Sequence, residues 1–100
     1  MLQQRVQLMC QIEECKPKAC YPLENLDVSQ IEDLSFIFRY SFYNGDLSKW
    51  NVSNSKTFSN MFARSDFNNN SLQNWNTSNV TNMHSMFYKS KFNGDTNEFH

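Results

Sequence analysis

Glycine and proline are scarce in this 100-residue sequence, with two of each, and the formal net charge is only −1. A nearly neutral chain lacks the basic footprint of a nucleic-acid-binding protein, so we do not expect direct binding to nucleic acid. No apolar run approaches the roughly 20 residues of a membrane-spanning helix, and the N-terminus has no apolar signal-peptide core. We therefore expect no membrane association and a cytoplasmic location, with the cell surface as the alternative.

The three cysteines, Cys10, Cys15 and Cys20, all lie in the first fifth of the chain. An odd number argues against a closed disulfide framework and favours a reducing compartment. A structural zinc site needs four ligands, and the two histidines, His84 and His100, are distant in sequence. With only two glycines, a glycine-rich phosphate loop is not available either. We expect no metal, no cofactor and no catalytic residue, and hence not an enzyme.

What the sequence has in excess is fourteen Asn, twelve Ser and nine Phe, and these residues recur at a fixed period. Equivalent segments begin at Leu23, Leu47 and Leu72, which are 24 and 25 residues apart. The register continues downstream through the aromatic positions Phe38/Phe62/Phe87 and Tyr43/Phe67/Phe92. Because a single unit of this length cannot bury its own apolar face, such units stack and align equivalent side chains into ladders. We predict these two ladders and a third of Trp50 and Trp75, with Leu26 at its first rung.

Within each unit the pattern predicts a strand, a turn and a short helix. Ser29, Ser53 and Ser78 are placed as helix N-caps, and apolar residues follow them at the i, i+3, i+6, i+7 spacing of one helix face. Alternating residues at 46–50 and 71–75 suggest short strands. We thus predict an α/β fold, a short leucine-rich-repeat-like solenoid of three strand–turn–helix units at 23–46, 47–71 and 72–95. Residues 1–22 are expected to form an N-terminal helical cap, and residues 23–100 the solenoid with a short tail.

Three segments carry a family resemblance. Residues 75–87 read WNTSNVTNMHSMF, residues 50–62 read WNVSNSKTFSNMF, and LDVS at 26–29 is a divergent first copy. This pattern resembles the repeat of BspA-type leucine-rich-repeat proteins of bacterial surfaces. The resemblance implies a solenoid used for adhesion or protein recognition, with no catalytic residues to carry over.

Candidate binding residues are those that fall outside the predicted core ladders. Tyr and Arg are favoured at binding hot spots, and clustered charge steers partners, although a solvated edge would contain the same residue types. Acidic residues gather in the first unit and basic ones in the later units. The predicted partner-binding residues are Tyr40, Phe42, Arg64, Tyr88, Lys89 and Lys91, together with Glu24, Asp27, Glu32 and Asp33.

These features predict a non-enzymatic protein–protein interaction module. We interpret it as a small intracellular inhibitor or adaptor that occupies a partner protein's surface, encoded by a phage or mobile element and blocking a host defence complex such as CRISPR. The alternative is a short member or a fragment of a bacterial surface adhesin. Self-association through an exposed solenoid end is a further expectation.

Overall fold

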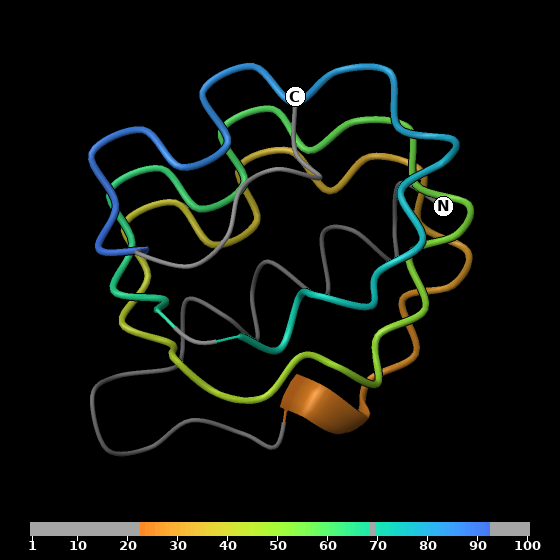
Figure 1. Cartoon of the computed structure of the whole chain (residues 1–100), viewed down its shortest axis with the longest axis horizontal. Helices are drawn as coiled ribbons and strands as arrows, with labels where there is room; N and C mark the ends of the chain where they lie inside the picture. Colours follow the sequence, from red (N-terminus) through yellow and green to blue (C-terminus); the bar gives the residue numbers. More distant parts are fainter. Residues whose placement is uncertain (1–22, 69, 93–100) are drawn as a thin grey trace.

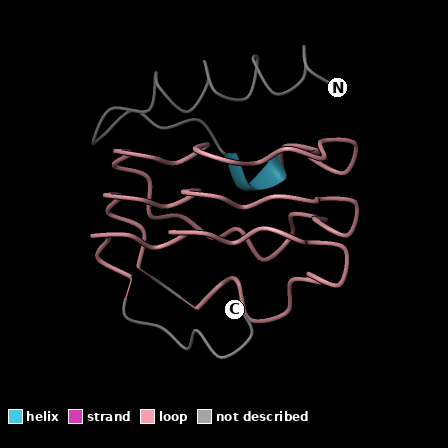
Figure 2. Cartoon of the chain, turned by 90° about the horizontal axis from the view of Figure 1, so that it is seen from above, coloured by secondary structure: helices cyan, strands magenta, loops and turns pink. Residues whose placement is uncertain are grey.

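Three stacked coils make up the part of the chain that the computed structural model describes, residues 23–68 and 70–92 (Figures 1 and 2). Coil 1 is 23–46, coil 2 is 47–71 and coil 3 is 72–92. Each coil lies over the next, so residues 24 or 25 positions apart meet in space. The predicted cap at 1–22 with its three cysteines, and the tail beyond residue 92, lie outside the described residues.

Backbone hydrogen bonds, and not regular strands, join the coils. In the described residues the regular elements are one 3-10 helix, η1 (Leu23–Asn25), and two parallel bridges, Asp33 with Thr57 and Thr57 with Asn82. From coil 1, the alternate N–H groups of Leu34, Phe36, Phe38 and Tyr40 donate to the carbonyls of Thr57, Ser59, Met61 and Ala63. From coil 2, those of Phe58, Asn60, Phe62 and Arg64 donate to Asn82, His84, Met86 and Tyr88.

The remaining N–H groups of the same segment close local turns. Ile37, Arg39 and Ser41 each donate to the carbonyl three residues earlier, and coils 2 and 3 repeat this arrangement. Neighbouring N–H groups thus alternate between the next coil and the same coil, which satisfies the backbone without a helix. The helices predicted after Ser29, Ser53 and Ser78 are therefore wrong, and overlapping turns replace them.

Local geometry explains why the helix prediction failed. Apolar residues three apart also fit a run of turns, so the i, i+3 spacing did not distinguish the two. Phe36 and Tyr40 have φ of 63° and 60°, and the equivalent residues of coils 2 and 3 also have positive φ. This left-handed conformation is incompatible with a right-handed helix. The strands predicted at 46–50 and 71–75 are likewise turns in this part of the chain, closed by the N–H groups of Trp50 and Trp75.

Aromatic ladders fill the interior between the coils, as predicted. The ring of Phe62 stacks on Phe38 at 5.2 Å and on Phe87 at 5.7 Å between centroids, with the planes within 6° of parallel. Trp50 and Trp75 stack at 6.4 Å, and Phe67 stacks on Phe92 at 6.1 Å. Leu26 packs against the same cluster. Phe38, Phe58, Phe62 and Phe67 are fully buried and are the largest such side chains of the core.

The Asn and Ser residues bind the backbone in the turns. Asn51 and Asn76 accept hydrogen bonds from the N–H groups of Ser53 and Ser78, and Asp27 does the same for Ser29. These serines are therefore the third residues of Asx turns and not helix N-caps. The Asn54 and Asn79 amides donate to carbonyls of the preceding coil, at Ser29 and Ser53. The excess of Asn thus serves both the turns and the stacking.

Candidate binding surface

One column of the stack carries large polar and aromatic side chains in a strained backbone conformation. Tyr40, Arg64 and Lys89 occupy equivalent places in the three coils, with φ of 60°, 55° and 51°. A left-handed conformation costs a non-glycine residue roughly 1–2 kcal/mol, and Gly or Asn adopts it most easily. All three side chains are exposed, so their contacts with the core do not explain why these residues stand there.

Cations lie over aromatic rings along this column and its neighbours. The Arg39 guanidinium is 5.5 Å from the Phe36 ring centroid and 4.9 Å from that of Tyr40. Arg64 lies 5.9 Å from the Tyr40 ring and 5.7 Å from the Tyr88 ring, which joins coil 1 to coil 3. The Lys89 ammonium is 5.4 Å from the Tyr88 ring. We call this continuous set the aromatic–cation stripe: Phe36, Arg39, Tyr40, Arg64, Tyr88 and Lys89.

The stripe brings together four of the residues predicted from sequence, namely Tyr40, Arg64, Tyr88 and Lys89. Tyr40 is 60% exposed and Tyr88 49%, which confirms that both are surface residues. Phe42, 54% exposed, and Lys91 lie two residues further along, and Lys91 forms an ion pair with Asp66 at 3.2 Å.

Sequence reasoning missed Phe36 and Arg39. Phe36 lies inside the stretch predicted as a helix, where it fell off the apolar face and carried no signal. Arg39 directly precedes Tyr40 but was not among the predicted binding residues. Both side chains are exposed in the structure, Phe36 at 39%.

The predicted acidic residues do not join the stripe, and each has a local partner. Glu24 accepts a hydrogen bond from the Tyr43 hydroxyl at 2.9 Å, and Asp27 accepts the Ser29 N–H at 2.9 Å. Asp33 accepts the Ser35 N–H at 2.9 Å. Glu32 pairs with Lys56 at 3.6 Å. The acidic side chains thus stabilise turns and coil contacts away from the stripe.

The pKa values of Tyr43 and Asp27 differ from their ordinary values. Burial is the main cause that raises the pKa of Tyr43 well above its ordinary value of 10.0, and the bond to Glu24 adds to it. The hydrogen bond from the Ser29 side chain is the main cause that lowers the pKa of Asp27 below 3.8.

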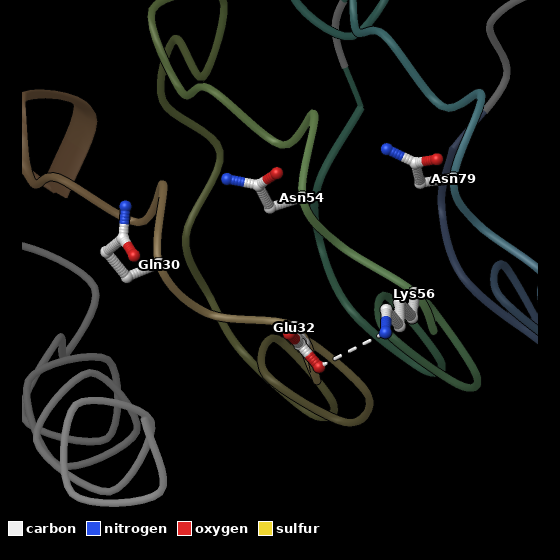
Figure 3. Close-up of a pocket in the computed structure, with 5 residues that line it drawn as sticks. All are labelled: Gln30, Glu32, Asn54, Lys56 and Asn79. Carbon is white, nitrogen blue, oxygen red and sulfur yellow. Dashed lines mark ion pairs between the residues drawn. The ribbon is translucent and has the colours of Figure 1, made fainter.

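A shallow polar depression lies beside Asn54 and Asn79, which occupy equivalent positions in coils 2 and 3 (Figure 3). Its volume is about 250 Å³, and its lining residues are Gln30, Glu32, Asn54, Lys56 and Asn79. Asn54 and Asn79 already donate to backbone carbonyls, and the ion pair between Glu32 and Lys56 satisfies the two charges. With its polar groups so engaged, the depression is a weaker binding candidate than the stripe.

The described part of the chain has neither a metal-binding cluster nor a membrane-spanning helix. Within 23–68 and 70–92, His, Cys, Asp and Glu side chains form no group suited to hold a metal ion. No helix in these residues has the length and apolar character required to cross a bilayer.

The stacked coils with an exposed stripe define a repeat-built protein, and comparison with known families places it further. The family model described as Mycoplasma protein of unknown function, DUF285, matches residues 6–100. The chain belongs to this family. Comparison with curated proteins and with solved structures gave no significant match.

Proposed function

We propose that this protein is a non-enzymatic protein-binding module that contacts its partner through the aromatic–cation stripe. We also propose that its coils are a short solenoid related to BspA-type leucine-rich repeats, consistent with the sequence resemblance. One observation carries the proposal: a chain of ring and cation contacts runs without interruption over all three coils on the exposed side of the molecule.

The residue types of the stripe and the backbone that holds them both support a binding role. Tyr and Arg are the residue types that contribute most at protein interfaces, and here they alternate. The N–H groups of Phe36, Tyr40 and Arg64 are bound to the next coil, so the backbone beneath these side chains is held in place. A partner therefore meets side chains on a backbone that is already fixed, which lowers the entropic cost of association.

In the role that we propose, the protein acts as an inhibitor or adaptor by covering a partner's surface. This requires only shape and charge complementarity, which the stripe offers. A role as a short adhesin, or as a fragment of one, would use the same surface and is the alternative.

A peptide-display selection tests the proposal. The purified full chain is immobilised and panned against random peptides, and recovered peptides are titrated against the wild type and against Tyr40→Asn/Tyr88→Ala. Asn tolerates the left-handed conformation of residue 40, and Ala63 already occupies the position equivalent to Tyr88 in coil 2. We expect the double variant to bind at least about tenfold more weakly, equal to about 1.4 kcal/mol.

The control is Lys49→Ala/Gln73→Ala, which changes two exposed residues away from the stripe. It should bind recovered peptides like the wild type. A selection that enriches no peptide, or peptides that bind the stripe variant as well as the wild type, would refute the proposal.

A further inference from the structure

We infer that the stripe recognises an acidic peptide segment, whose Asp and Glu carboxylates bind the edges of Arg39 and Arg64 and the ammonium of Lys89. This inference rests on the proposed function and specifies the chemistry of the partner.

The first support is the segregation of charge. Residues 23–68 and 70–92 contain six Lys and Arg and six Asp and Glu. Four of these cations, Arg39, Arg64, Lys89 and Lys91, lie in the stripe or at its flank. Asp66 lies at the same flank, where it pairs with Lys91. A nearly neutral protein thus presents a surface with an excess of positive charge, which attracts an acidic partner.

The second support is how the guanidinium groups are held. Arg64 lies over the rings of Tyr40 and Tyr88, and Arg39 lies over Phe36 and Tyr40. An arginine stacked by its face on an aromatic ring keeps the N–H groups of its edge available, and these form paired hydrogen bonds with a carboxylate. The rings therefore support the arginines at the surface, where an anion can reach their N–H groups.

The same arrangement favours a peptide over single-stranded nucleic acid. Nucleic-acid strands bind such surfaces by stacking bases on open aromatic faces. Here two guanidinium groups lie over the Tyr40 ring, and Arg64 and Lys89 lie over the Tyr88 ring. A base would have to displace these cations, whereas a carboxylate binds without disturbing them.

The backbone gives a third support. The left-handed positions 40, 64 and 89 hold Tyr, Arg and Lys, although Asn60 in the same chain shows that Asn suits such a position. Strain of this kind clusters at binding sites, where the side chain outweighs the backbone cost.

The test is a titration by fluorescence anisotropy at low salt. The probe is a labelled peptide of about ten residues with alternating Asp and Gly, and the reference replaces each Asp with Asn. We expect the acidic peptide to bind and the Asn peptide not to bind. Binding should weaken sharply near 1 M salt, where the Debye length falls to about 3 Å.

Two double variants separate site from net charge. Arg64→Asn/Lys89→Asn removes two cations from the stripe and leaves a residue that tolerates positive φ. Lys49→Asn/Lys56→Asn removes two cations elsewhere and changes the net charge equally. We expect the first to weaken binding of the acidic peptide at least about tenfold and the second by less than about threefold. Urea unfolding of each variant verifies that it is folded.

Three outcomes would overturn the inference: no binding of the acidic peptide, equal losses in the two double variants, or tighter binding of an oligothymidine of similar length. The proposed function would still hold after any of these results if binding of the display peptides requires Tyr40 and Tyr88 and the peptides are not acidic. If display peptides ignore the stripe, the proposed function fails first.

Discussion

The indole N–H of Trp75 donates to the backbone carbonyl of Leu47, 28 residues earlier, at 2.9 Å. Trp50 repeats the contact one coil up, with the carbonyl of Leu23 at 2.8 Å. Each of these carbonyls also accepts an N–H from its own turn, from Trp50 and Leu26 respectively. Each of these buried Trp side chains thus attaches its own coil to the turn that begins the preceding coil.

Trp75→Phe is expected to lower the free energy of unfolding by about 1–3 kcal/mol. The phenyl ring retains part of the stack on Trp50, but the hydrogen bond is lost and the smaller ring leaves a gap. The Leu47 carbonyl keeps its bond from the Trp50 N–H, which limits the loss. Urea unfolding followed by circular dichroism measures it, and an unchanged midpoint would contradict the coupling role of the indole.

Phe62→Ala should destabilise the protein more than Phe87→Ala. Phe62 is fully buried and stacks on rings of both neighbouring coils, whereas Phe87 is half-buried. Removing a buried Phe costs about 3–5 kcal/mol, a large part of the 5–15 kcal/mol that stabilises a typical domain. Unfolding by urea of the two variants side by side tests this order. Equal losses of stability in the two variants would contradict a larger contribution from the central ring, Phe62.

Lys89→Gly should leave stability unchanged or raise it slightly, whereas Lys49→Gly should lower it by about 0.5–1 kcal/mol. Lys89 has a φ of 51°, and Gly relieves that strain at the cost of added freedom in the unfolded chain. Lys49 is also exposed but has no positive φ, so there Gly adds only the cost. Thermal unfolding midpoints of the pair provide the comparison. A loss at residue 89 as large as at residue 49 would contradict the strain at this column.

Stability should fall above about pH 10, and Tyr43→Phe should reduce that fall. The folded state raises the pKa of Tyr43, so above 10.0 the unfolded chain releases this proton while the folded one retains it. The contribution of Tyr43 is therefore complete below pH 10 and is lost as the pH rises. Phe is the residue at the equivalent positions 67 and 92, so it should fit. Urea midpoints at pH 8 and pH 11 measure the difference, and parallel curves for both proteins would refute it.

The repeat and its aromatic ladders could be predicted from sequence because equivalent side chains recur at equal spacing. The stacked pairs Phe38–Phe62 and Trp50–Trp75 follow directly from that register. The local backbone could not be predicted, because the donors of Leu34 and Phe36 are satisfied by another coil, and this pairing leaves no local pattern.

The candidate site was partly predictable for a related reason. Tyr40, Arg64 and Lys89 fell outside the apolar register and so were identified as exposed. These residues and Arg39 form one set of ring contacts only because each turn directs its side chain toward the same surface. Positive φ at 40, 64 and 89 sets that direction, and it occurs there without the Gly or Asn that would have revealed it.

At positions 40, 64 and 89 the side chain is exposed and the core does not depend on it. This has an evolutionary consequence. The hydrogen bonds between coils use only main-chain atoms here, and the core is built by other columns. Substitutions in this column can therefore change the chemistry of the exposed surface while leaving the fold intact. The exposed surface can thus vary one residue at a time, without the protein first having to gain stability elsewhere.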